Sequence, residues 1–414
     1  MAEDYVIRVA NSPLELDACA WDTLLQTQPN PSPFLRHAYL AALHASGSAT
    51  TKTGWTPHFF TLHIGKTLMA ACAIYEKSHS YGEYVFDWAW ANAYAQHGLR
   101  YYPKALVAVP FTPVPGSRLL ARSAAKRLLL VQALLQWCEA ERLSSLHMLF
   151  CSTEDLQACE QAGLMLRHTV QFHWNNQAPT LAASRAALPP ERAHFALGRP
   201  GGETQLYGNF EEFLTSLSQE KRKKIRQERR KVVDAGVNFR CATGAAITPP
   251  DWDFFYRCYE RTYLEHGNAP YLSRAFFHMM ATNMPENWLL FIAARQGQDI
   301  AASLIAIDAS GIVPVAYGRY WGALERVDCL HFEACYYQPL QWCIAQGYQR
   351  FEGGAQGEHK MARALLPVRT SSAHWLAQPE FAAAVERFLE REDRGIGQYL
   401  EDLGRRSPFK VASE

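Results

Sequence analysis

Short apolar runs separated by glycine and proline divide the first half of the chain into alternating strands and helices. Apolar runs too short for helices predict strands at residues 84–90, 105–110, 146–150 and 169–174. Apolar residues with helical spacing predict helices at 119–137 and at 154–161, the second of which ends at Gly163. Because a strand, a turn and a helix follow one another repeatedly, this half is expected to form an α/β unit.

The second half repeats this succession. Two apolar runs, 288–294 and 300–307, flank the polar turn 295–299 and predict a hairpin. A strand is expected at 312–320, followed by a helix at 329–345 that Gly347 ends and Pro339 kinks. Further strands are expected at 349–352 and 371–376. The pattern therefore predicts an α/β protein with duplicated architecture.

One segment between these halves has the composition of a linker. Between residues 177 and 206 the chain is rich in Ala, Pro and Gly and shows no sustained period. A chain of 414 residues is long enough for two domains with separate cores. We therefore predict a first domain at 1–177, an insertion or linker at 178–206, and a second domain at 207–414 that begins with a basic helix.

Composition and charge narrow the class of protein. Hydrophobic residues make up 48% of the chain, which excludes a disordered protein. The 41 Lys and Arg residues almost balance the 40 Asp and Glu residues, which excludes a protein that coats nucleic acid with its whole surface. The ten cysteines contain no Cys-x-x-Cys pair, which favours reduced thiols. Because the start is acidic and no apolar run reaches about 20 residues, we expect a soluble, cytoplasmic protein.

The positive charge is concentrated in one predicted helix. Residues 221–231 hold eight bases and one acid, so removing their +7 from the net +1 leaves −6 on the rest of the chain. The apolar stripe of this helix runs from Phe210 through Leu217 to Val232, and the helix is expected to end at Gly236. Its charge predicts a binding surface for RNA, a nucleotide-linked substrate or an anionic membrane. The alternative is a solvated helix. The residues expected to bind anions are Lys221, Lys223, Lys224, Arg226 and Arg230.

Residues 81–88 interleave acids with aromatic residues. Alternation in a strand would place Glu83 and Asp87 on one face, where carboxylates could bind a substrate ammonium ion or act as bases. The alternative is an edge strand with solvated acids.

A proline-rich turn at 111–118 is expected to join a strand to the start of a helix. Free amide groups at a helix start favour anionic oxygens, and Arg118 adds a permanent positive charge. The segment predicts a phosphate site, and the alternative is a purely structural turn.

The segment 351–360 combines three glycines with titratable side chains. The glycines allow backbone amides to approach a ligand, while Glu352, His359 and Lys360 supply acid, base and cation. The alternative is a turn whose backbone conformation requires glycine and which is flanked by surface charges. The sequence lacks the motifs of a phosphate loop, a dinucleotide-binding fold, a nucleophile elbow and a zinc helix, and we expect no metal site.

Six segments spread over nearly the whole chain resemble the FemAB-like proteins, a bacterial family within the wider group of GNAT-like acyltransferases. They are residues 81–90, 99–104, 109–113, 171–175, 221–226 and 351–360. The resemblance implies tandem GNAT-like domains, each a mixed, mostly antiparallel sheet flanked by helices. It also implies transfer of an acyl or aminoacyl group to an amine acceptor, such as a peptidoglycan precursor or another small peptide or amino-acid-like substrate.

The resemblance also implies a donor and catalytic roles. The donor would be acyl-CoA or aminoacyl-tRNA, which makes tRNA an expected partner. The GNAT pyrophosphate loop, Gln/Arg-x-x-Gly-x-Gly/Ala, is absent from both halves, which leaves the use of CoA open. His359 or Glu352 would accept the amine proton, and Lys360 or the amides of Gly353 and Gly354 would stabilise the tetrahedral oxyanion.

The acceptor is expected in a cleft between the two domains. The residues expected to bind it are Tyr81, Glu83, Asp87, Trp88, Lys104, Arg319 and Lys360. The alternative function is a non-catalytic protein that holds RNA or an anionic cell-wall precursor on the basic helix. Any membrane contact would be peripheral, because no segment is expected to span a bilayer.

Overall fold

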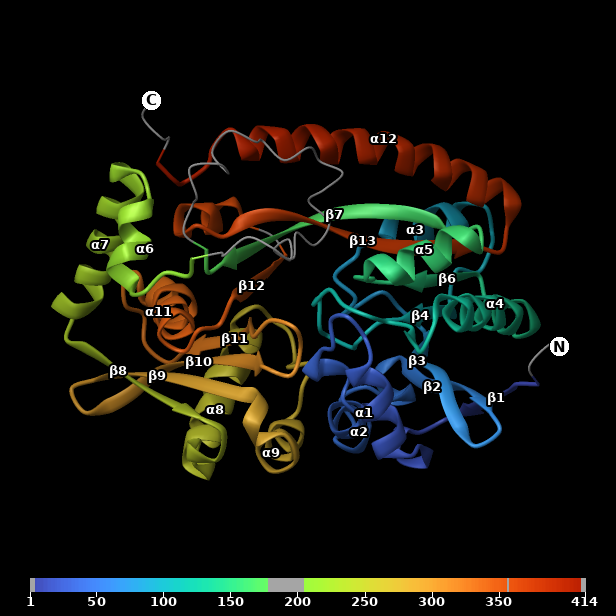
Figure 1. The fold of residues 1–414 in the computed structure, drawn as a ribbon, viewed down its shortest axis with the longest axis horizontal. Coiled ribbons are helices and arrows are strands. Elements are labelled where there is room, and N and C mark those ends of the chain that lie inside the picture. The colour runs from blue at the N-terminus through green and yellow to red at the C-terminus, as the bar shows by residue number, and fades with distance from the viewer. Residues whose placement is uncertain (1–3, 178–204, 356, 411–414) are drawn as a thin grey trace. The chain divides into compact units, whose positions relative to one another are not determined.

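The computed structural model describes residues 4–177, 205–355 and 357–410, and backbone contacts divide the chain into two compact units (Figure 1). Unit 1 contains Met1–Thr169, Tyr271–Phe276 and Thr370–Gly397, and unit 2 contains Val170–Pro270, Phe277–Arg369 and Gln398–Glu414. The predicted insertion at 178–206 lies outside the described residues except for its last two positions.

Unit 1 is built on a mixed sheet with the strand order β1-β2-β3-β4-β6-β13. Its strands are β1 (Val6–Ala10), β2 (Trp55–Ile64), β3 (Thr67–Lys77), β4 (Lys104–Val107), β5 (Leu120–Ala121), β6 (Ser145–Met148) and the end of β13 (Leu366–Leu376). Its helices are α1 (Ala18–Gln26), α2 (His37–Ala45), α3 (Trp88–Gln96), α4 (Ala124–Ala140) and α5 (Thr153–Gln161). β4 and β6 run parallel, and the other neighbours in this order pair antiparallel.

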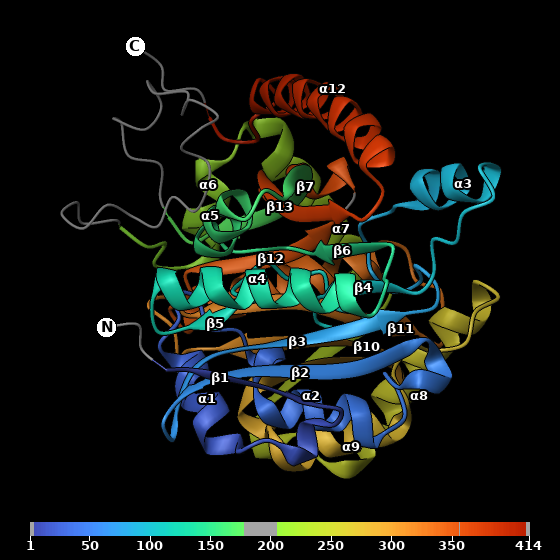
Figure 2. The same ribbon diagram turned by 90° about the vertical axis from the view of Figure 1, so that its right-hand side faces the viewer.

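Helices cover both faces of this sheet. Successive side chains of β2 point to opposite faces. Phe60 packs with Leu130 and Leu134 of α4 in one core, and Figure 2 shows α4 running in nearly the same direction as β2 and β3. Phe59 faces the other side, where its ring lies 6.0 Å from that of Trp21 in α1. Side chains on both faces of this sheet thus pack against helices.

The strands of unit 2 follow one another in the order β7-β12-β11-β10-β9-β8, in which β11 and β12 pair parallel. Its strands are β7 (Met165–Asn175), β8 (Val237–Thr243), β9 (Trp288–Arg295), β10 (Gln298–Asp308), β11 (Val315–Ala323) and β12 (Arg350–Ala355). Its helices include α6 (Phe210–Ser216), α7 (Gln219–Asp234), α8 (Pro249–Glu265), α10 (Leu330–Phe332) and α11 (Gln338–Ala345). α9 (Arg274–Asn283), α12 (Pro379–Gly404), β7 and β13 each contribute residues to both units.

Adjacent residues of β9 face the two sides of the unit 2 sheet. Leu289 packs in the core that α6, α7 and α11 cover, whereas the ring of Trp288 lies 6.1 Å from that of Trp252 in α8. α8 approaches β11 so closely that a Cβ on Gly322 would lie 1.9 Å from the carbonyl oxygen of Cys258. A glycine is therefore required where this helix crosses the strand.

The predicted fold class, α/β with mixed and mostly antiparallel sheets flanked by helices, is confirmed. The predicted hairpin is formed by β9 and β10. None of the helices in the described ranges is both long enough and apolar enough to cross a membrane.

Two predictions for unit 1 are wrong, one in the type of element and one in its start. Residues 84–90 are not a strand, because Gly82 and Tyr84 adopt positive φ angles of 81° and 65° and α3 begins shortly afterwards. The helix predicted at 119–137 starts later, because Leu120 and Ala121 pair with β3 and Ser123 caps α4. Hence the turn at 111–118 does not lead directly into a helix.

Two predicted helices of unit 2 are interrupted. The basic helix is divided into α6 and α7, because Leu217 is extended and Ser218 caps α7. The helix predicted at 329–345 consists of α10, the π-helical turn Glu333–Tyr337 and α11. Pro339 lies in the first turn of α11, directly after the π-helical turn.

Candidate active site

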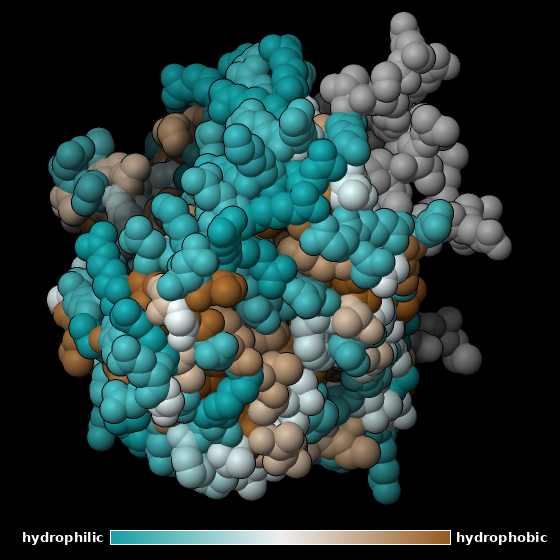
Figure 3. All heavy atoms as spheres, turned by 90° about the vertical axis from the view of Figure 1, so that its left-hand side faces the viewer, coloured by the Kyte–Doolittle hydropathy of each residue, from teal (hydrophilic) through white to brown (hydrophobic). Residues whose placement is uncertain are grey.

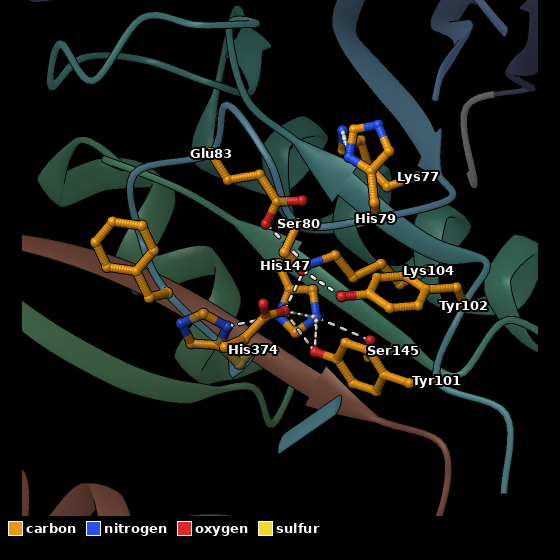
Figure 4. Close-up of polar contacts among 12 residues, drawn as sticks. Lys77, His79, Ser80, Glu83, Tyr101, Tyr102, Lys104, Ser145, His147 and His374 are labelled. Carbon is orange, nitrogen blue, oxygen red and sulfur yellow. Dashed lines mark hydrogen bonds and ion pairs between the residues drawn. The ribbon is translucent and has the colours of Figure 1, made fainter. Parts of the chain in front are cut away.

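A buried lysine with two carboxylates forms the centre of a polar cluster in unit 1. Lys104 begins β4 opposite Lys77 at the end of β3. Its Nζ lies 2.8 Å from Glu83 Oε2 and 2.8 Å from Ser80 Oγ, and it also contacts Asp87 Oδ2. These five side chains are buried, and Figure 4 shows Lys104 directed toward Glu83 and Ser80. Predicted acceptor-binding residues from two different segments are therefore in contact.

The loop between β3 and α3 turns its acids inward and its aromatic rings outward. Gly82 has a φ of 81°, and a Cβ there would lie 2.6 Å from the ring of Phe111. Tyr81 and Trp88 are 59% and 37% exposed, with ring centroids 5.2 Å apart. The predicted grouping of acids with aromatic residues is thus present, but a turn rather than strand alternation produces it.

A chain of hydrogen bonds extends the cluster to β6 and β13. The hydroxyl of Tyr101 donates to Asp87 Oδ2 at 2.6 Å and lies 3.1 Å from His147 Nε2. That nitrogen is also 2.8 Å from Ser145 Oγ, and Nδ1 of His147 is 2.7 Å from Nδ1 of His374. Because one of the two facing Nδ1 atoms must donate, the tautomers of the two histidines are linked.

Burial and charge move the pKa values of this cluster in different directions. Burial raises the pKa of Glu83 to about 7 although Lys104 opposes the rise. Burial lowers the pKa of Lys77 to about 7. Burial would also raise the pKa of Asp87, but Lys104, His147 and Ser80 together outweigh it and hold that pKa well below its usual range. Burial lowers the pKa of His147 to about 3. Glu83 and Lys77 are therefore the groups that exchange protons near neutral pH.

This arrangement suits proton transfer. Lys104 holds one oxygen of Glu83, and the other, Oε1, is buried without a hydrogen-bond partner in the described part of the chain. A carboxyl group with a pKa near 7 can accept a proton from an amine and return it to a leaving group. Lys104 remains positive, because its two carboxylates raise its pKa against the effect of burial.

The predicted catalytic pair lies in unit 2. Glu352 is buried on β12, and its Oε1 lies 3.1 Å from Nε of Arg350. His359 is exposed on the 3₁₀ helix Glu358–Arg363, where partial burial and nearby cations lower its pKa. Lys360 is buried, donates to the carbonyl oxygen of Gly354 at 3.3 Å, and has a pKa lowered to about 8 by burial. Arg319 lies half-buried on β11.

Arg363 fixes the turn that carries His359. Its guanidinium donates to the carbonyl oxygen of His359 at 2.7 Å and to Glu228 Oε2 of α7 at 2.7 Å. The same group lies 3.6 Å from the ring centroid of Phe332. Glu228 also accepts a hydrogen bond from Tyr337. The inner face of the basic helix is thus bonded to the predicted catalytic turn.

The predicted anion-binding residues have different surroundings. Arg118 is buried, and its guanidinium donates to backbone carbonyl oxygens, including that of Leu149 at 2.8 Å. On α7, three predicted residues form exposed ion pairs, namely Lys221 with Glu220, Arg226 with Glu211 and Arg230 with Asp234. Lys223 and Lys224 are exposed.

Six members of the unit 1 cluster were not predicted from the sequence. They are Lys77, Ser80, Tyr101, Ser145, His147 and His374. The available signal was a polar residue within or beside an apolar strand, such as His147 in the run 146–150. Such a residue must find a partner when it is buried, but the sequence does not say which one.

Comparison with solved structures identifies relatives in fold. FemX matches at 9% sequence identity and a TM-score of 0.51, with 92% of this chain and 100% of FemX covered. The C-terminal DUF2156 domain of a candidate lysylphosphatidylglycerol synthetase from Agrobacterium fabrum matches at 10% identity and a TM-score of 0.50, with 90% of this chain and 96% of that domain covered. At these identities the likeness concerns the fold alone. No curated protein matches the sequence.

The sequence matches the FemAB-like family, described as peptidoglycan biosynthesis/recognition, over residues 12–181 and 203–411. This match covers most of the chain and includes all six segments that carry the resemblance. The chain therefore belongs to the FemAB-like family.

Proposed function

We propose that this protein transfers an acyl or aminoacyl group to an amine acceptor and that Glu83 removes the proton from that amine. The observation that carries the proposal is the buried Glu83 carboxyl, with one oxygen held by Lys104 and a pKa near 7. The family description supports an acceptor related to peptidoglycan precursors. Acyl-CoA and aminoacyl-tRNA are the candidate donors.

The reaction requires the chemistry that this carboxyl supplies. An amine is protonated near neutral pH and must lose a proton before its nitrogen can attack the carbonyl carbon of the donor. A C–N bond then forms, and the C–S bond of acyl-CoA or the C–O bond of aminoacyl-tRNA breaks. The first proton of the ammonium ion leaves to solvent, and Glu83 would take the second proton from the attacking nitrogen and return it to the leaving sulfur or oxygen. Lys104 would keep Glu83 in place during both transfers.

His359 with Glu352 in unit 2 is the second proposal for the base. It is supported by the lowered pKa of His359, which leaves the imidazole neutral and able to accept a proton near pH 7. Glu352 is held by Arg350, whose Nε lies 3.1 Å from its Oε1. Lys360 remains the proposed donor to the oxyanion, because its buried amine lies on the same turn.

The proposal is tested with the purified full chain and a panel of substrates. Acyl-CoAs and charged tRNAs serve as donors, and soluble muropeptides, amino acids and phosphatidylglycerol serve as acceptors. Phosphatidylglycerol is included because the matched Agrobacterium fabrum protein is a candidate lysylphosphatidylglycerol synthetase. Mass spectrometry measures the product whose amine, or hydroxyl in the lipid, has been acylated.

Three variants then separate the candidate bases. Glu83→Gln is expected to lower the rate by about 10² to 10⁴-fold while the chain stays folded. The matched control Glu141→Gln, at an exposed position of the same unit, is expected to retain the full rate. If His359→Ala abolishes the reaction and Glu83→Gln does not, the base is His359. Full activity in both variants would contradict both assignments.

A further inference from the structure

The outward face of α7 carries positive charge that the protein itself does not neutralise. Arg222, Lys223, Lys224 and Lys231 have no ion-pair partner in the described part of the chain, whereas the neighbouring bases pair with acids. Lys223, Lys224 and Lys231 are exposed, and Arg222 is half-buried. Figure 3 faces the side of the molecule on which α7 lies, and hydrophilic residues cover most of its upper part.

The inner face of α7 fixes the direction of these side chains. Ile225 and Val232 are buried at 1% exposure each, and buried Glu228 accepts a hydrogen bond from Arg363 at 2.7 Å. Because the helix is held on this side by both apolar packing and an ion pair, its basic side chains project outward. Lys223 and Lys231 are eight residues apart, which separates them by about 12 Å along the axis.

The C-terminal segment adds a fifth base beside the start of α7. The backbone N–H of Lys410 donates to the carbonyl oxygen of Ser216 at 3.0 Å, and the N–H of Ser218 donates to that of Pro408 at 2.9 Å. Lys410 is exposed and has no ion-pair partner among the described residues. We use "the α7 surface" for Arg222, Lys223, Lys224, Lys231 and Lys410. These residues come from segments that are distant in the sequence.

The composition of the α7 surface favours a lipid headgroup layer over a nucleic acid. α7 contains no aromatic residue, whereas single-stranded nucleic acids are bound by stacking of their bases on aromatic side chains. Its last turn instead exposes the apolar Val233 at 69%, and bases next to an apolar side chain suit the interface of an anionic membrane. We propose that the α7 surface binds membranes rich in anionic phospholipids. This inference goes beyond the proposed function, because it concerns recruitment and not the transfer step.

The charge of the surface sets the size of the effect. Each basic residue near an anionic membrane increases partitioning by about fivefold at moderate ionic strength. Removing three of the five charges should therefore weaken partitioning by about 100-fold. Added salt should weaken binding of the wild type in the same direction, because it screens exposed charges.

The test is co-sedimentation of the full chain with vesicles. One set contains phosphatidylcholine alone, and the other contains about one-third phosphatidylglycerol. The test variant combines Lys223→Gln, Lys224→Gln and Lys231→Gln. The matched control neutralises three exposed bases of unit 1, Arg8→Gln, Lys52→Gln and Lys66→Gln, so that the net charge changes equally.

We expect the wild type to sediment with the anionic vesicles and not with phosphatidylcholine alone. The α7 variant should lose this binding, and the control should retain it. Equal sedimentation of the α7 variant and the control would overturn the proposal. Failure of the wild type to sediment, combined with α7-dependent binding to RNA in a filter assay, would also overturn it and assign the surface to RNA. Each result is independent of whether Glu83 is the catalytic base.

Discussion

Replacing Lys104 with methionine should destabilise unit 1 severely. The substitution keeps most of the apolar stem of the side chain but removes the ammonium group that contacts Glu83 at 2.8 Å, Ser80 at 2.8 Å and also Asp87. Both carboxylates are then left in a buried site without their cation. Removing one partner of a buried ion pair costs about 3–5 kcal/mol. Because two acids lose the same partner, we expect the upper part of this range.

Urea unfolding followed by circular dichroism measures the effect. With an m value of about 2–3 kcal/mol/M, the expected loss lowers the midpoint by roughly 1.3–2.5 M. Adding Glu83→Gln and Asp87→Asn to the Lys104→Met chain removes the uncompensated charges and should recover most of this loss. This recovery separates the loss of charge pairing from a general packing defect.

Lys66→Met serves as the control, because Lys66 is exposed in the same unit. It should change the free energy of unfolding by less than about 0.5 kcal/mol. A loss of under about 1 kcal/mol in Lys104→Met, or no recovery in the triple variant, would refute the ion-paired cluster.

Three further results are expected from the same unfolding assay. Gly82→Ala should cost about 2–4 kcal/mol from left-handed strain and from the clash with an aromatic ring, whereas Gly65→Ala, with open space around it, should cost about 1 kcal/mol. Arg363→Met should cost about 3–5 kcal/mol by leaving Glu228 buried and unpaired, and adding Glu228→Leu should restore most of it; an unchanged midpoint in the single variant would be inconsistent with the pair. The depressed pKa of His147, about 3 against an ordinary 6.5, means that the unfolded chain binds this proton first. The free energy of unfolding should therefore fall by about 1.4 kcal/mol for each unit by which the pH is lowered from 6.5 toward 3. A His147→Gln variant with the same pH slope would disprove this origin.

The sequence predicted elements whose boundaries coincide with changes in apolar pattern. The β9–β10 hairpin followed from two apolar runs around a polar turn, and local pairing of this kind needs no distant contact. The break of the basic helix at Leu217 was missed, because its apolar periodicity continues across the break. The turn before α3 was missed for a different reason. Tyr84 adopts a positive φ that its residue type disfavours, and tertiary packing holds it there.

Only part of the site could be predicted from the sequence, because several of its contacts join distant segments. Glu83 and Asp87 were predicted together because they are two positions of one short segment. Lys104 was named from the family resemblance, and its contacts with those acids required the pairing of β3 with β4. His147 and His374 are 227 residues apart, and only the pairing of β6 with β13 brings their Nδ1 atoms within 2.7 Å. Arg118 matched a phosphate-binding pattern, but its guanidinium is engaged by carbonyl oxygens of its own unit.

The central claim is that Glu83 is the base in transfer to an amine, and the pH dependence of product formation tests it most directly. The rate of the wild type, measured at subsaturating acceptor, should rise with pH through about 7, because Glu83 must be deprotonated to accept the proton. In Glu83→Gln the residual rate should lose this inflection, while the Glu141→Gln control should keep it. A Glu83→Gln variant that retains both the wild-type rate and the inflection near pH 7 would contradict the account.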